Sequence, residues 1–310
     1  MLDSTDIKKQ AKEIGFHLVG IAAIDPQLVQ QTADRLDKWL SQGYQAEMQW
    51  MTNPRRRDPH EILPTAKSII AIALNYYQPD ARPPEAAKIS RYAWGKDYHK
   101  VCTKKLKALH QWLQAIYPSN HFRYYTDTGP IGDKAWAEAS GLGWIGKNGN
   151  LITREYGSWV FLGEIITDLE ITPDRPHQEH CGTCTRCLTA CPTQAIVSPF
   201  VVDAGRCIAY HTIENRAEEL PESIGQNLQG WVAGCDICQD VCPWNQRFAQ
   251  ATDVEEFVVN PGRVNSSLAE LAVMSDEEYQ EIFRGSALKR IKPYMFRRNA
   301  RANLSHLQEQ

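Results

Sequence analysis

Eight of the nine cysteines in this 310-residue chain lie in one short region, between positions 181 and 242. Four form the run Cys-x2-Cys-x2-Cys-x3-Cys-Pro, which starts at Cys181, and a shorter run, Cys-x2-Cys-x3-Cys-Pro, starts at Cys235. The first spacing is the one that bacterial ferredoxins use to hold [4Fe–4S] clusters, and its fourth cysteine ligates the other cluster of a pair. The two runs together therefore predict two clusters.

The second run lacks a first cysteine at the usual spacing, and Cys207 can supply it. The predicted ligation is crossed, with the sets Cys181, Cys184, Cys187, Cys242 and Cys191, Cys207, Cys235, Cys238. Zinc sites usually pair two Cys-x2-Cys units without the following proline. A disulfide framework is not expected in a cytoplasmic chain. Because two clusters only store and move electrons, the cysteine-poor first half must supply an electron-accepting cofactor or a docking surface.

Asp127 is the candidate catalytic acid of the first half. It lies in YYTDTGP, between a predicted strand and a turn. An acid at the C-terminal end of a strand in an α/β domain can be catalytic, but the same pattern also suits a turn or capping aspartate. Asp133 is expected to cap the helix that follows it. His99, in DYHKVC, is expected to make local hydrogen bonds at a helix N-terminus.

The glycine-rich stretch SGLGWIGKNG, residues 140–149, leaves two interpretations open. It follows a helix, so it does not match the dinucleotide fingerprint, which joins a strand to a helix. It can form turns that need a positive φ, or it can lay its backbone against a large flat cofactor. Cys102 is expected to be a core residue of a helix.

The elements that must position these residues alternate along the first half of the chain. Capping and periodicity predict helices over 5–14, 26–40, 98–116 and 134–140, strands over 16–24, 68–77 and 121–126, and a hairpin over 151–167. This pattern predicts an α/β (α+β) domain over residues 1–172, then a cysteine-rich unit over 173–250 and a helical, basic segment over 251–310.

Composition adds no specific partner. Apolar residues make up 43% of the chain and the net charge is −3, which is ordinary for a soluble protein. The N-terminus has no secretory pattern, and no apolar run approaches the roughly 20 residues needed to span a bilayer. A cytoplasmic location is therefore expected.

Several segments, taken in order, resemble the epoxyqueuosine reductase family from about residue 5 onward: YYTDTGP, GLGWIGKNGNLIT, GSWVFLGEIIT, CGTCTRCLTACPTQAI and GCDICQDVCPWN. The resemblance implies an oxidoreductase that reduces epoxyqueuosine to queuosine at the wobble position of tRNA with GUN anticodons. It implies a nitroreductase-like domain that binds base-off cobalamin, and a ferredoxin-like domain whose two [4Fe–4S] clusters feed the cobalt. A low-potential electron donor and a monomeric state are expected, with no membrane contact.

The resemblance also implies roles for single residues. Asp127 becomes the proton donor, with a pKa raised by burial near Tyr124, Tyr125 and Trp144. Cobalamin contacts are expected at Ser90, Arg91, Lys147, Asn148, Gly149, Leu151 and Ile152. Phosphates of the anticodon arm are expected at Lys289, Arg290, Lys292, Arg297 and Arg298, which otherwise form a solvated basic helix. The alternatives are a corrinoid-dependent reductive dehalogenase and a ferredoxin-type electron carrier.

Overall fold

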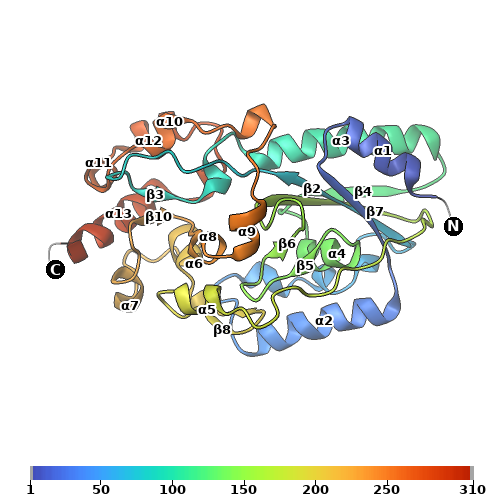
Figure 1. Ribbon diagram of the computed structural model, residues 1–310, viewed down its shortest axis with the longest axis horizontal. Coiled ribbons are helices and arrows are strands. Elements are labelled where there is room, and N and C mark those ends of the chain that lie inside the picture. Colours follow the sequence, from blue (N-terminus) through green and yellow to red (C-terminus); the bar gives the residue numbers. More distant parts are fainter. Residues whose placement is uncertain (1–2, 308–310) are drawn as a thin grey trace.

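A four-stranded antiparallel sheet forms the centre of the N-terminal half of the computed structural model, which describes residues 3–307. Its order is β1 (Leu18–Ala23), β2 (Ser68–Asn75), β7 (Val160–Thr167) and β4 (Phe122–Tyr125). Every residue of β2 is buried because β2 lies between two other strands and both of its faces are covered. Figure 1 shows the sheet with helices on either side.

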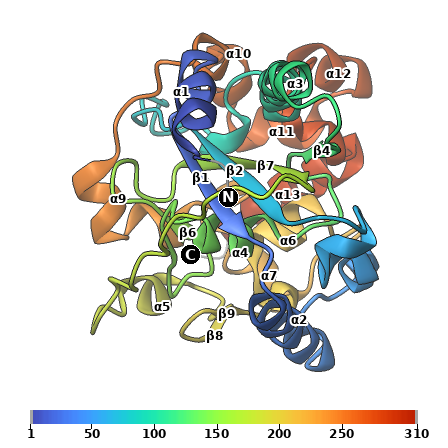
Figure 2. The same cartoon turned by 90° about the vertical axis from the view of Figure 1, so that its right-hand side faces the viewer.

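The two faces of β2 pack against different helices. Ile70, Ile72 and Leu74 face α1 (Thr5–Glu13) and α3 (Tyr98–Ile116). The alternate residues face α4 (Asp133–Ala139), where Trp136 and Ala137 are buried. The alternation follows from the two-residue period of a strand. Figure 2 shows α1 and α3 above the sheet and α2 (Pro26–Ser41) below it.

The starts of α2 and α3 follow the sequence signals. Asp25 accepts the amides of Gln27 and Leu28 at the start of α2, where Pro26 takes the first helical position. Asp97 accepts the amide of His99 and so begins α3 beside the cavity described below.

The prediction of a hairpin over residues 151–167 is wrong. The short strand β6 (Leu151–Ile152) pairs with β5 (Trp144–Ile145), whereas β7 pairs with β2 and β4. The chain turns through a single bridge between Thr153 and Gly157 before it enters the sheet. Side chains of β7 are buried on both faces, which suits an interior strand rather than one arm of a local hairpin.

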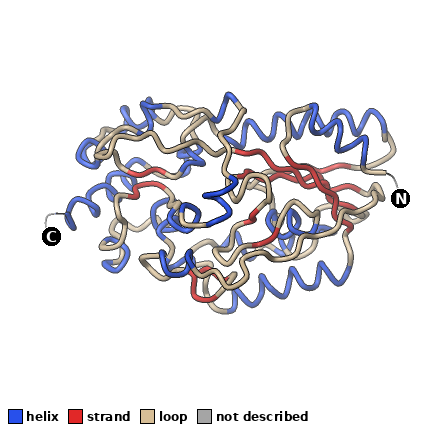
Figure 3. Tube along the Cα trace, in the orientation of Figure 1, coloured by secondary structure: helices blue, strands red, loops and turns tan. Residues whose placement is uncertain are grey.

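Short elements and loops make up most of the remaining chain, as Figure 3 shows. The strands are β3 (Lys88–Ile89), β8 (Ile196–Ser198), β9 (Val201–Val202) and β10 (Trp231–Ala233). The α-helices are α5 (Arg186–Ala190), α6 (Ile208–Ile213), α7 (Glu222–Gly225), α8 (Ile237–Asp240), α9 (Pro243–Phe248), α10 (Pro261–Val264), α11 (Leu268–Val273), α12 (Asp276–Ile282) and α13 (Pro293–Leu307). The 3-10 helices are η1 (Gln49–Thr52), η2 (Pro54–Arg56), η3 (Pro59–Glu61), η4 (Arg91–Ala93), η5 (Ala204–Arg206), η6 (Glu255–Phe257) and η7 (Ala287–Arg290).

A second core joins parts of the chain that are distant in sequence. Strand β3 pairs in parallel with β10, and Ile89 and Trp94 pack with Val232 and with residues of α11 to α13. Phe296 of α13 is buried in this core. The C-terminal segment thus packs on the rest of the chain, and the division at residues 172 and 250 stays a prediction. No helix within residues 3–307 is long and apolar enough to cross a membrane.

Candidate active site

A cavity of about 2070 Å³ opens between the sheet, α2 and the cysteine-rich region. It is about twice the upper end of the usual range for small-molecule pockets, so it has room for more than one large ligand. Trp39, Trp50 and Phe200 contribute apolar walls, and the cavity reaches from Asp127 to the cysteines of the second predicted cluster.

Asp127 faces this cavity from the Asp127 loop, which we define as residues 126–132, directly after β4. Its φ of 54° is in the left-handed region, which is uncommon for a residue other than glycine. One carboxylate oxygen, Oδ2, accepts hydrogen bonds from Tyr98 Oη at 2.8 Å and from His99 Nε2 at 3.1 Å. The side chain is 61% exposed because it borders the cavity rather than the core.

His99 connects Asp127 to a second carboxylate. Its Nδ1 lies 2.8 Å from Oδ1 of Asp97, so the imidazole lies between two acids. Burial lowers the pKa of His99, but the hydrogen bonds to Asp127 and Asp97 outweigh burial and raise that pKa to about 9. The ring is therefore protonated at neutral pH.

The expectation that burial raises the pKa of Asp127 is wrong. Burial acts in that direction, but the hydrogen bonds from His99 and Tyr98 outweigh it and hold the pKa below its ordinary value. The expected apolar walls also lie elsewhere: Tyr124 packs in the core beside α3, and Trp144 packs against Trp244. Tyr125 packs in the core beside α4. The positively charged proton donor in hydrogen-bond contact with the Asp127 carboxylate is therefore the imidazolium of His99.

Asp133 does not cap α4, contrary to expectation. Gly132 takes the cap position, and Oδ1 of Asp133 instead accepts the backbone amide of Asp127 at 3.2 Å. Arg56 holds the Asp127 loop through its guanidinium, which donates to the carbonyls of Gly129 at 3.0 Å and Ile131 at 2.9 Å. The sequence gives no local signal for this role of Arg56, because each contact joins residues more than 70 positions apart.

The eight clustered cysteines fall into two groups in space. Cys181, Cys184, Cys187 and Cys242 line a separate cavity of about 160 Å³. The other four, Cys191, Cys207, Cys235 and Cys238, line the large cavity that holds Asp127. This is the division that the crossed ligation predicts, and four thiols around one hollow fit a cubane with a cysteine at each iron.

Two family models match parts of this chain, and curated relatives match nearly all of it. A family model described as epoxyqueuosine reductase QueG, DUF1730, matches residues 56–128, and one described as 4Fe-4S double cluster binding domain matches residues 180–245. The epoxyqueuosine reductase of Synechocystis sp. is 62% identical over 92% of this chain and 100% of its own. That of Atelocyanobacterium thalassa is 52% identical over 98% and 100%.

The chain belongs to the epoxyqueuosine reductase family. Solved structures agree: an epoxyqueuosine reductase with a tRNA-Tyr epoxyqueuosine-modified stem loop has a TM-score of 0.89 at 34% identity, over 98% of this chain and 81% of that one. The Bacillus subtilis enzyme, with its aspartate catalytic loop swung out of the active site, has a TM-score of 0.89 at 33% identity, over 99% and 82%. The fold is thus that of a two-cluster epoxyqueuosine reductase.

The residues that the family resemblance assigned to cobalamin do not all line one cavity. Ser90, Asn148 and Gly149 line the large cavity. Lys147 and Ile152 line the smaller cysteine cavity instead, and Lys147 Nζ donates to the carbonyls of Gly182 and Cys184. Leu151 is packed in the core. Residues 147–152 run between the two cavities, so neighbouring side chains of this segment line different cavities.

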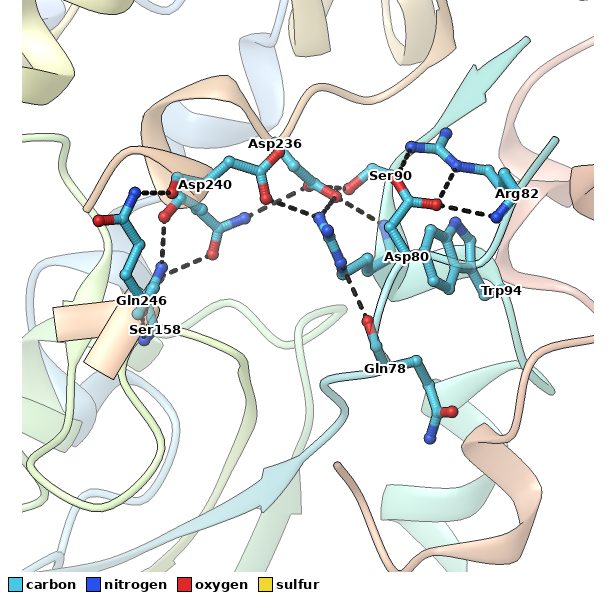
Figure 4. Close-up of polar contacts among 12 residues, drawn as sticks. Gln78, Asp80, Arg82, Ser90, Trp94, Ser158, Asp236, Asp240 and Gln246 are labelled. Atoms are coloured by element: carbon cyan, nitrogen blue, oxygen red, sulfur yellow. Dashed lines mark hydrogen bonds and ion pairs between the residues drawn. The ribbon is translucent and has the colours of Figure 1, made fainter. Parts of the chain in front are cut away.

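Arg91 does not line the large cavity, and its contact with cobalamin stays a prediction. Its Nη1 is 3.3 Å from Asp236 and 2.8 Å from Asp240, two acids that flank Cys235 and Cys238. Ser90 Oγ donates to Asp236 at 2.5 Å, and the resulting network ties η4 to the second cysteine run (Figure 4). Asp236 is fully buried, and a buried carboxylate needs such partners.

The basic residues assigned to tRNA have unequal surroundings. Lys289 and Arg290 line the large cavity, where Arg290 pairs with Glu214 and lies 5.8 Å from the ring of Trp50. Lys292 is exposed, and Arg297 pairs with Asp276 at 2.6 Å. Arg298 is buried, so its assignment to tRNA phosphates is wrong. It donates to the carbonyls of His211, Asn215 and Ala217 at and beyond the end of α6.

Proposed function

We propose that this chain reduces epoxyqueuosine to queuosine at the wobble position of tRNA with GUN anticodons, in the cytoplasm. One observation carries the proposal: a candidate proton-donating centre, Asp127 with His99, lines the same cavity as four cysteines of a [4Fe–4S] site. A solved relative that shares the fold carries an epoxyqueuosine-modified tRNA stem loop. The proposed proton donor and the proposed electron source thus line the same cavity.

The large cavity suits a cofactor between the second cluster and Asp127. Its volume and its exposed apolar side chains Val197 and Phe200 fit base-off cobalamin. When bound, cobalamin supplies a strongly reducing cobalt. Ser90, Asn148 and Gly149 are the residues proposed to hold it.

Residues of this chain hold the proton and transfer it to the substrate. The imidazolium of His99 gives a proton to Asp127 through the 3.1 Å contact, and Asp127 passes it to the substrate oxygen in the cavity. Asp97 favours the charged ring and fixes which nitrogen faces Asp127. Tyr98 holds Oδ2 at 2.8 Å, so that the acid keeps its orientation.

The tRNA contact is proposed at the mouth of the cavity. Lys289, Arg290 and Lys292 supply positive charge for phosphates, and the exposed ring of Trp50 offers a stacking surface for a base. A low-potential electron donor reduces the clusters, and the enzyme acts as a monomer.

Nucleoside mass spectrometry tests the proposal. Anaerobic protein, loaded with both clusters and cobalamin, is mixed with a low-potential reductant and epoxyqueuosine-containing tRNA. Queuosine should appear, whereas a halogenated aromatic compound under the same conditions should remain intact. Dehalogenation without queuosine formation would replace the proposed activity by the corrinoid dehalogenase alternative.

A further inference from the structure

Two carboxyl groups are paired behind the Asp127 loop and have no role in the function proposed above. Glu164 lies on β7, opposite Ala71 of β2 and Tyr125 of β4, and is only 2% exposed. Its carboxyl is hydrogen-bonded to that of Asp133, at the start of α4. A carboxylate only accepts hydrogen bonds, so this contact exists only when one of the two acids carries a proton.

The surroundings favour one retained proton. Oε1 of Glu164 is buried and has no hydrogen-bond partner within residues 3–307. The charged groups near the pair are Arg56, Asp127 and Lys134. With a single proton, the pair has one negative charge, which the guanidinium of Arg56 balances. Burial raises the pKa values of both acids. At Asp133 the hydrogen bond with Glu164 acts against burial and the charge of Asp127 acts with it, whereas at Glu164 both Asp133 and Asp127 raise the pKa further.

The proposed reaction needs two protons on the same oxygen. Two electrons, which arrive through the clusters from the low-potential donor, reduce the epoxide carbons. The first C–O bond breaks and the oxygen becomes a hydroxyl with one proton. The second C–O bond breaks as the C=C bond of queuosine forms, and the hydroxyl leaves as water with another proton. The imidazolium of His99 accounts for only one of these.

We propose that the Asp133–Glu164 pair stores the second proton and returns it to Asp127 after the first has reached the substrate oxygen. The inference rests on the proposed function. The pair adjoins the loop that carries Asp127, because Oδ1 of Asp133 accepts the backbone amide of Asp127 at 3.2 Å. Both acids act through Asp127 and are positioning residues for its proton. The relay of His99 and the pair thus holds two protons before turnover begins.

Infrared spectroscopy tests the stored proton without turnover. Wild-type protein without substrate should show the carbonyl band of a protonated carboxyl at neutral pH, and Glu164→Gln and Asp133→Asn should each lose it. Asp127→Asn should keep it. The absence of this band in the wild type, or its persistence in both variants of the pair, overturns the proposal whatever the substrate of the enzyme proves to be.

Kinetics then test the use of that proton. Glu164→Gln should lower kcat for queuosine formation by about 10²-fold with KM unchanged, which is the low end of a general-acid contribution. Small carboxylic acids added to the buffer should restore part of the rate, whereas a purely structural defect would not respond to them. Glu164→Asp, which keeps an acid, should be closer to the wild type.

A matched control is Glu170→Gln, which changes an exposed acid beyond the end of β7 and should keep the wild-type rate. If Glu164→Gln is folded and converts epoxyqueuosine at the wild-type rate, the pair does not supply the second proton, even though the proposed function stands. If no variant and no wild type converts it, the proposed function fails, and the infrared result still decides whether the pair stores a proton.

Discussion

His99 is the residue whose role the structure changes most. A local sequence pattern explains its contact with Asp97, but the contact with Asp127 joins residues 28 positions apart. An acid with a lowered pKa cannot itself hold a proton at neutral pH, so Asp127 depends on the imidazolium beside it.

The pH dependence of turnover tests this arrangement. The pKa of His99 is about 9, so the rate of queuosine formation should be constant through neutral pH and fall as the pH rises through about 9. His99→Gln should lower the rate about 10²-fold and remove this decline. Single-turnover rates measured across the range provide the check, and an unchanged profile in the variant would contradict the role of the ring.

The free energy of unfolding should also depend on the protonation of His99. Because folding raises the pKa of His99 from the ordinary value of 6.5 to about 9, its stabilisation is complete below 6.5 and is lost as the pH rises through 9. Urea unfolding of wild type and His99→Gln, below 6.5 and above 9, should therefore show their difference in unfolding free energy shrink at high pH. A constant difference would mean that the ring is not charged in the folded protein.

Among the structural elements, α6 and α13 are joined by a buried arginine. Arg298 of α13 donates to three carbonyl groups at and beyond the C-terminal end of α6, where a helix leaves its last carbonyls unpaired. Arg298→Ala should lower the free energy of unfolding by about 3 kcal/mol, because buried acceptors lose their partner. Urea unfolding measures the loss. Lys292→Ala, at an exposed position on the same segment, should change stability little.

The crossed cysteine pairing makes a prediction about which cluster each variant loses. Cys242→Ser should affect the same paramagnetic signal as Cys184→Ser, because both residues line the smaller cavity. Cys191→Ser should affect the signal that Cys235→Ser affects, since both line the large one. Electron paramagnetic resonance of the reduced proteins distinguishes the two. An uncrossed result, with Cys191→Ser and Cys184→Ser alike, would contradict the assignment.

The elements also show how far the sequence could predict this protein. Cysteine spacing and the caps of α2 and α3 are local signals, and these elements lie where the sequence predicts them. The pairing of β7 with β2 is a contact between distant segments, and a hairpin pattern cannot reveal it. Glu164 interrupts the apolar strand VFLGEIIT, which was a signal for a buried acid. Charge alone did not distinguish the buried Arg298 from the exposed Lys292.

For the molecule as a whole, the cavity mouth should bind RNA by charge. Lys289→Gln and Lys292→Gln should weaken tRNA binding and reduce its salt dependence, by about 0.7–0.9 in the slope of log K against log salt for each phosphate that is no longer neutralised. Lys104→Gln, at an exposed position of α3, should leave the slope unchanged. Filter binding over a range of salt measures it. Equal slopes in all three variants would place the RNA surface elsewhere.

The central claim is that one cavity joins an electron supply to the proton on the His99–Asp127 pair. The most direct measurement compares wild type with Asp127→Asn, both loaded with clusters and cobalamin and reduced anaerobically, by nucleoside mass spectrometry of epoxyqueuosine-containing tRNA. The wild type should form queuosine, and Asp127→Asn should form almost none while its cofactor spectra remain the same. Equal queuosine formation by both proteins, or none by fully loaded wild type, would contradict the claim.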